Sequence, residues 1–274
     1  MMNSHFAKFD HHNIHYWEVG TGFPILMIHG VGPGTSILGN FGPVLEPLSQ
    51  KFHIFAMDLI GFGESGRKNK PPFFDLDLWI KQALFLIKNV LPDGPCGIAG
   101  HSLGGALSLK ISSQSKRIKR VLTSSTIGSR YKINDALDQF WTLPKNKNAL
   151  KSSMTKMAFD NSSLTEEMIN QRWKLLQADG YADYFNEMFV PPRQQYIDLA
   201  VVEPEEIKNI GSKVVMLHGS EDLPCPPQET TIKLATYLPK AKVHLLPNCG
   251  HNLPRERTAD YIAVATELFG NQNY

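Results

Sequence analysis

Continuous apolar segments alternate with helical patterns along most of this chain, and this alternation constrains the fold more than any other feature. The apolar segments lie at residues 24–28, 52–60, 96–100, 121–126, 213–219 and 241–247. The helical patterns that follow them cover residues 44–52, 75–92, 103–114, 226–239 and 257–269. Strands that are apolar at successive positions are typical of parallel sheets buried on both faces. The sequence therefore predicts an α/β fold, with a mostly parallel central sheet and helices on both faces.

The alternation stops between residues 129 and 202. This segment has several helical stretches rich in Trp, Tyr, Met and Phe but no strand pattern. We therefore expect two parts of one core, residues 1–128 and 203–274, separated by a helical lid over 129–202. Such an insertion would cover the carboxyl ends of the strands, where open α/β sheets bind ligands.

Composition excludes several classes of function. The formal net charge of +2 is too small to indicate a nucleic-acid or anionic-membrane partner. The three cysteines are widely spaced, so they suggest neither a disulfide framework nor a metal site. The amino-terminal segment is polar, and no run reaches the ~18 apolar residues of a membrane span. We expect a cytoplasmic protein that acts on a small molecule without a cofactor, and a homodimer stays open.

The segment Gly100-His101-Ser102-Leu103-Gly104 fits the pattern G-x-S-x-G between a predicted strand and a predicted helix. A nucleophile elbow requires this setting, because a sharp turn exposes the serine oxygen while small neighbours let the backbone pack. The same glycines could instead form a simple packing turn. The context favours Ser102 as a catalytic nucleophile.

A serine hydroxyl needs a base to remove its proton and an acid to orient that base. Asp222 follows the strand pattern at 213–219, and His251 follows the one at 241–247. The chain order Ser, Asp, His is that of serine hydrolases with an elbow of this kind. Glu221 is the alternative acid, but Asp222 lies three residues beyond Gly219, the more usual spacing.

Most of the ten histidines have simpler interpretations than catalysis. The histidines of the segment DHHNIH are expected in a turn and a strand, since no acid or cysteine set completes a metal site. His29 and His218 each end an apolar run and are expected to be structural. His101 adjoins the nucleophile and could line the pocket or face the scaffold.

An oxyanion formed during acyl transfer requires two preorganised donors. The backbone N–H of Leu103 follows the nucleophile directly and is one candidate. The glycine-rich loop at residues 29–34 offers the second, from Val31 or from its neighbour Gly32. A phosphate-binding loop is disfavoured because no Gly-Lys-Ser/Thr follows.

Together the segments HGVGPG, DLIGFGES, GHSLGG, HGSEDLP and CGH resemble the α/β-hydrolase superfamily over essentially the whole chain. The resemblance implies the α/β-hydrolase fold. Within that superfamily the chain is most similar to hydrolases that cleave C–C bonds in meta-cleavage products of aromatic catabolism. The shared features are the Gly-Pro-Gly loop, Asn40-Phe41, and lid segments 159–173 and 191–200.

That resemblance implies substrate-binding roles for Asn40 and Arg172, which would hold the carboxylate and dienol end of a 2-hydroxy-6-oxo-dienoate. The sequence gives Arg172 independent support. A capping box from Ser163 to Glu166 predicts a helix starting near Leu164. On it the neighbours of Arg172 at three and four residues are all apolar, where a lone cation needs a partner. A lid carboxylate is the alternative to a substrate carboxylate.

Three further residues belong to the predicted pocket. Trp173 adjoins Arg172 and could stack on substrate, although lid packing is the simpler interpretation. His101 and Asn252 stand where the family usually has Asn and Trp, and both positions border the substrate in that family. The alternatives to C–C hydrolysis are a carboxylesterase with the same triad and a ligand receptor built on a hydrolase scaffold.

Overall fold

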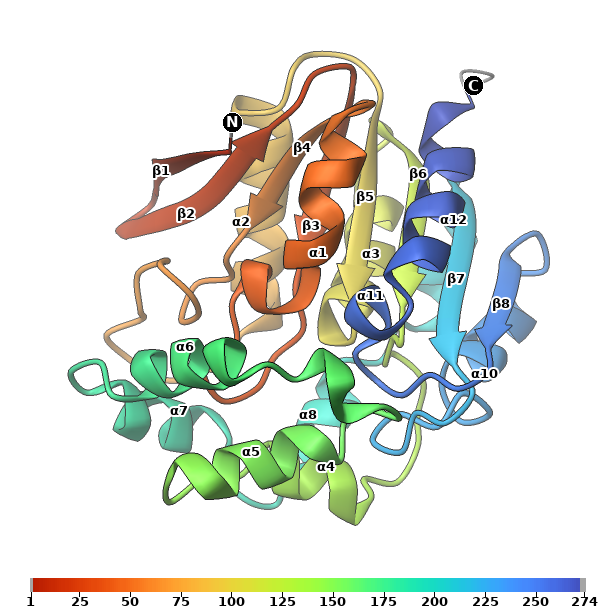
Figure 1. The fold of residues 1–274 in the computed structure, drawn as a ribbon. Helices are drawn as coiled ribbons and strands as arrows, with labels where there is room; N and C mark the ends of the chain where they lie inside the picture. The colour runs from red at the N-terminus through yellow and green to blue at the C-terminus, as the bar shows by residue number, and fades with distance from the viewer. Residues whose placement is uncertain (1, 272–274) are drawn as a thin grey trace.

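The computed structural model describes residues 2–271, and its centre is one eight-stranded sheet (Figure 1). Its strands are β1 (Asn3–Phe9), β2 (His12–Val19), β3 (Phe23–Ile28), β4 (Phe52–Met57), β5 (Cys96–His101), β6 (Ile118–Ser124), β7 (Lys213–Gly219) and β8 (Lys242–Leu246). Their order is β1-β2-β4-β3-β5-β6-β7-β8. All pairs from β4 to β8 are parallel, whereas β2 is antiparallel to both β1 and β4. The predicted mostly parallel sheet is confirmed.

Two features of the amino-terminal strands were not predicted. The edge strand β1 alternates exposed and half-buried residues, so its sequence lacks the apolar run that marks the inner strands. The strands on either side of the turn at residues 20–22 do not pair with each other, because β4 lies between β2 and β3. Only long-range pairing decides this, and a local pattern cannot show it.

Helices cover both faces of the sheet. They are α1 (Ile37–Ser49), α2 (Leu76–Asn89), α3 (Leu103–Gln114), α9 (Pro204–Lys208), α10 (Thr231–Tyr237), α11 (Leu253–Glu256) and α12 (Thr258–Gly270). Side chains of α1 and α12 pack into one apolar cluster, while α2 and α3 pack into the other with much of the lid. The sheet is therefore buried on both sides, which explains its unbroken apolar strands.

The segment between β6 and β7 is helical and lies across the carboxyl ends of the parallel strands (Figure 1). It contains α4 (Asp135–Phe140), α5 (Lys147–Thr155), the 3₁₀ turn η1 (Asn161–Ser163), α6 (Glu166–Leu176), α7 (Tyr181–Met188) and α8 (Gln194–Leu199). No helix among residues 2–271 is both long and apolar enough to cross a membrane.

Three predicted helix starts were wrong. Helix α1 begins at Ile37, capped by the Ser36 side chain, and not at residue 44. Its internal prolines disguised it: Pro43 has no N–H for the carbonyl of Gly39, and the Arg255 guanidinium donates to that oxygen at 2.6 Å instead.

Helix α6 begins at Glu166 rather than near Leu164. The N-cap is Thr165, whose hydroxyl accepts a hydrogen bond from the backbone N–H of Met168 at 3.2 Å. The capping residue therefore lies two positions beyond the Ser163 that the sequence suggested. Helix α10 begins at Thr231 rather than at residue 226, because residues 227–230 form turns before it.

Candidate active site

Ser102 stands at a strained turn between β5 and α3, with φ 55° and ψ −121°. The turn is possible because glycines stand two residues before and two residues after Ser102. A Cβ on Gly100 would lie 2.0 Å from the carbonyl oxygen of Gly104, and a Cβ on Gly104 would lie 2.3 Å from that of Ile28. A non-glycine residue in this left-handed region is uncommon, and such strain concentrates at functional sites.

Asp222 and His251 come from the loops after β7 and β8 and meet beside this turn. Asp222 Oδ2 accepts a hydrogen bond from His251 Nδ1 at 2.8 Å, so Nε2 is left as the basic nitrogen. Asp222 Oδ1 accepts from the backbone N–H of Cys225 at 2.9 Å, which fixes the carboxylate plane. All three predicted triad residues are buried.

Burial and mutual charge shift the pKa values of both His251 and Asp222. Burial alone favours the neutral imidazole, but the adjacent carboxylate of Asp222 outweighs it and holds the pKa of His251 well above its ordinary value. Burial likewise opposes the charge of Asp222, yet the positive field and hydrogen bonds of His251 and His218 lower the pKa of that carboxyl. The pair therefore suits an imidazole that accepts and stabilises a proton.

A small cavity of about 10 Å³ lies between Ser102, His251 and the lid. Its walls are formed by Gly30, Val31, Thr35, Asn40, His101, Ser102, Phe140, Met157, Arg172, His251 and Asn252. Within residues 2–271 no hydrogen bond joins the Ser102 hydroxyl to His251. Catalytic hydrogen bonds of this kind often tighten only in the substrate complex.

Of the three predicted oxyanion donors, Val31 and Leu103 lie at the site and Gly32 does not. Val31 lines the cavity, and Leu103 begins α3 directly after the nucleophile. Neither amide takes part in a turn or loop hydrogen bond of the described structure. Gly32 instead packs under the lid, since a Cβ there would lie 2.2 Å from the ring of Phe140. The geometry favours Val31 over Gly32 as the second donor.

Arg172 lies on α6, is 4% exposed, and faces this cavity. Burial, reinforced by the like charge of Arg255, lowers its pKa from the ordinary arginine value to about 10. Its Nη1 reaches the carbonyl oxygen of Pro33 only at 3.5 Å, and Nε has no partner among the described residues. No carboxylate of residues 2–271 forms an ion pair with it, so the alternative of a lid Asp or Glu fails.

Asn40 lies on α1 rather than in a loop, and it also faces the cavity. Its Oδ1 accepts a hydrogen bond from the backbone N–H of Gly30 at 2.9 Å. With that oxygen engaged, the side-chain NH₂ is the group left to meet a ligand. Asn40 thereby also holds the loop that presents Val31.

Of the remaining predicted pocket residues, His101 and Asn252 line the cavity and Trp173 does not. His101 lines the cavity and bonds the Ser124 hydroxyl at 3.1 Å, and burial together with the charge of His251 holds its pKa well below the ordinary value. Asn252 lines the cavity too. Trp173 does not, because one step of about 100° along α6 from Arg172 turns it toward the apolar core.

Comparison with known proteins identifies the fold family. The sequence pattern of the alpha/beta hydrolase family matches residues 25–264. The chain belongs to this family. A 2-hydroxy-6-oxo-2,4-heptadienoate hydrolase of Pseudomonas putida is 27% identical to this hydrolase over 262 residues, covering 95% of this chain and 93% of its own.

Two further relatives are similar over nearly their full lengths. A 2-hydroxymuconate semialdehyde hydrolase of Pseudomonas sp. (strain CF600) is 27% identical, covering 93% of this chain and 89% of its own. A mutant meta-cleavage product hydrolase of Pseudomonas fluorescens IP01 has a solved structure that superimposes with a TM-score of 0.89 at 27% identity. It covers 96% of each chain.

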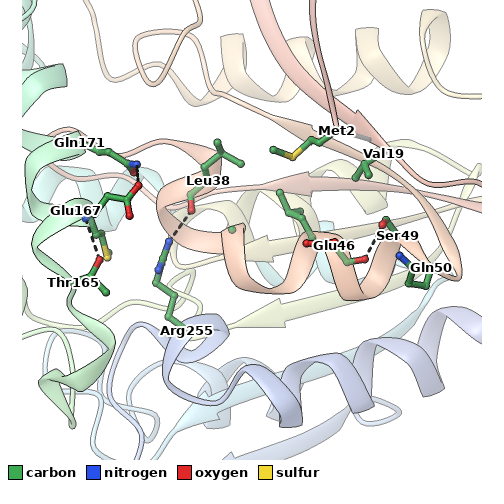
Figure 2. A pocket seen from close by; sticks show the side chains of 13 residues that line it. Met2, Val19, Leu38, Glu46, Ser49, Gln50, Thr165, Glu167, Gln171 and Arg255 are labelled. Carbon is green, nitrogen blue, oxygen red and sulfur yellow. Dashed lines mark hydrogen bonds between the residues drawn. The ribbon is translucent and has the colours of Figure 1, made fainter.

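The hydrolase also has a much larger groove, of about 580 Å³, which contains no triad residue (Figure 2). It extends from α6 along α1 and is lined on the core side by Leu38 and Glu46 and on the lid side by Glu167 and Gln171. Arg255 lies between these two sides. We place the chemistry in the small cavity, since the reactive groups converge there and volume alone does not identify a catalytic site.

Two residues next to the triad were missed or assigned otherwise by the sequence. His218, expected to be structural, has Nε2 3.0 Å from Asp222 Oδ2 as well as 2.8 Å from the carbonyl oxygen of Cys225. Glu221, the alternative acid, accepts instead from the backbone N–H of Cys249 at 3.0 Å. Sequence order suggested neither contact. The Glu221 contact depends on how the loops after β7 and β8 meet, and the His218 contact depends on how the loop after β7 folds back onto that strand.

One donor set of the hydrolase could in principle hold a metal ion. Ligand atoms of Asp222, Cys225 and His251 lie within 4.8 Å of one another. Both oxygens of Asp222 already accept hydrogen bonds, from the backbone of Cys225 and from His251. A metal there would have to displace the Asp222–His251 contact, so we assign the set to acid–base chemistry.

Proposed function

We propose that this chain is a serine-dependent hydrolase that cleaves a C–C bond in a 2-hydroxy-6-oxo-dienoate, a meta-cleavage product of aromatic catabolism. The relatives at 27% identity are named for substrates of this kind. The products would be a 2-hydroxydienoate and a carboxylic acid. Fold and triad are common to many hydrolases, so the substrate class must come from the pocket.

The triad residues have distinct roles in this proposal. Ser102 attacks the ketone carbonyl, or activates the water that does, while His251 takes the proton and Asp222 holds the Nδ1–H tautomer. The oxyanion is held by the amides of Val31 and Leu103. The protonated His251 then delivers its proton to the departing carbon, so that a C–C bond breaks and a C–H bond forms. Water completes the carboxylic acid product.

Arg172 is the observation that carries the C–C assignment. A carbon leaving group is expelled readily only if its electron pair is delocalised, here into the dienolate and its carboxylate. A buried cation without a protein carboxylate, on the wall that also holds Ser102, supplies a bidentate partner for that end. A simple ester releases an alkoxide and needs no such cation.

Parallel assays decide between the two reactions. Purified protein is mixed with a coloured 2-hydroxy-6-oxo-dienoate and, separately, with a short-chain chromogenic ester. We expect kcat/KM to be higher for the dienoate, and Ser102→Ala to abolish turnover of both while the protein stays folded. Efficient ester cleavage without dienoate cleavage would favour a carboxylesterase. Binding with negligible turnover of either would favour a receptor.

A further inference from the structure

Glu256, at the end of α11, binds backbone amides from two separate segments. Its Oε1 accepts from Asn252 N–H at 3.0 Å, and its Oε2 accepts from Gly250 N–H at 3.0 Å. These two amides flank His251. The same Oε2 also accepts from the lid, from Phe159 N–H at 2.7 Å and Asp160 N–H at 3.4 Å. No cation pairs with this carboxylate within residues 2–271.

The lid and the histidine loop also touch directly at this place. The backbone N–H of His251 donates to the carbonyl oxygen of Met157 at 2.6 Å. A Cβ on Gly250 would lie 2.6 Å from the backbone nitrogen of Phe159, so only glycine allows this approach. Met157 itself lines the cavity that contains Ser102. The segment 157–160 therefore rests on the loop that carries the catalytic base.

A second carboxylate holds the same loop from its other side. Glu221 accepts from Cys249 N–H at 3.0 Å, and its own N–H donates to the Cys249 carbonyl oxygen at 3.0 Å. These bonds tie the histidine loop to the loop that carries Asp222. Glu221 and Glu256 thus act on one loop but connect it to different parts of the molecule.

We propose that Glu256 is a positioning residue that couples the seating of the lid to the orientation of His251. The inference rests on the role proposed above for His251. A cavity of about 10 Å³ is too small for a dienoate, so substrate binding requires lid residues to move. Because one carboxylate oxygen serves both segments, a displaced lid loosens His251, and a seated lid restores its contact with Asp222.

The first test is Glu256→Gln with Glu221→Gln as matched control. A carboxamide has one acceptor oxygen, so the backbone N–H groups bound to the other oxygen lose their acceptor. In Glu256→Gln we expect faster hydrogen exchange at residues 159–160 and 250–252 and a kcat about 10- to 100-fold lower. The acid limb of kcat/KM should move to lower pH, since a loosened His251 is less stabilised by Asp222. In Glu221→Gln exchange should rise at 249–251 but not in the lid.

The second test perturbs only the lid side. Phe159→Pro removes the lid N–H, whereas Phe159→Ala keeps it and removes a side chain that is already half exposed. We expect the Pro variant, but not the Ala variant, to speed exchange at 250–252 and to lower kcat. The Phe159→Pro variant also tests the proposal if Glu256→Gln fails to fold.

Faster lid exchange with unchanged kcat and pH profile would overturn the proposal and leave Glu256 as a structural contact. Unchanged exchange at 250–252 in Phe159→Pro would do the same. Exchange needs no substrate, and kcat is followed on whichever of dienoate or ester the wild type turns over. A wrong substrate class is thus distinguishable from a failed coupling.

Discussion

Replacing Arg172 by Met should stabilise the protein and impair its chemistry at the same time. Arg172 is 4% exposed, and burial lowers its pKa to about 10. This lowering from the ordinary arginine value corresponds to about 3 kcal/mol of unfavourable free energy for the buried cation. The penalty holds at every pH below about 10, because the group is charged in the folded and unfolded states alike.

The compensating interactions of Arg172 are weak. The 3.5 Å contact with Pro33 is long for a hydrogen bond, and the guanidinium lies 5.9 Å from the Phe140 ring centre, at the outer limit of about 6 Å for a cation–π contact. We therefore expect Arg172→Met to gain about 1–2 kcal/mol in unfolding free energy. For a chain of this size that is a Tm increase of roughly 2–8 °C, measured by thermal unfolding.

The same substitution should lower kcat/KM for the dienoate by about 100- to 1000-fold, because a bidentate charge-assisted pair is lost. Turnover of a neutral ester should change by less than about 3-fold. Arg255→Met is the matched control: its guanidinium binds the carbonyl oxygens of Leu38 and Gly39, so its loss should lower Tm. A lower Tm for Arg172→Met, or equal losses on both substrates, would show that Arg172 is structural.

Two further predictions concern the elbow and the base. Gly104→Ala places a Cβ 2.3 Å from the backbone oxygen of Ile28 and should lower the free energy of unfolding, measured with denaturant, by about 3 kcal/mol or more. Gly211→Ala is the control: it has open space around it and should change that free energy by less than about 0.5 kcal/mol. Because Asp222 raises the pKa of His251 and the base must be neutral, kcat/KM should rise with pH to a plateau above the ordinary histidine value. Asp222→Asn should lower kcat about 10⁴-fold and move that limb to lower pH, and an unmoved limb would contradict the assignment.

Local sequence patterns were sufficient for the inner part of the fold. Strand β7 and helix α3 have the predicted bounds, 213–219 and 103–114, because each is an uninterrupted segment ended by its own turn or cap. Patterns failed where tertiary contacts compensate for unfavourable residues. Helix α1 contains Pro43, which has no N–H for the carbonyl oxygen of Gly39. That oxygen accepts a hydrogen bond from Arg255, more than two hundred residues away.

For the site, motif and spacing were enough to nominate Ser102, Asp222 and His251, because each follows a strand whose end lies at the same edge of a parallel sheet. The apolar neighbours of Arg172 likewise marked it as a cation in need of a partner. What the sequence determined was therefore the reactive groups and the order in which the fold presents them.

Only the tertiary structure decided how those groups are held. That Arg172 has no carboxylate partner among the described residues, that Gly32 packs under Phe140, and that Trp173 turns to the core depend on how the lid is seated. The same is true of Glu256, whose carboxylate joins lid and histidine loop. The contact of Glu256 with Phe159 links residues about a hundred positions apart through a backbone amide. Every residue except proline carries such an amide, so no pattern of side chains in the sequence can predict the contact.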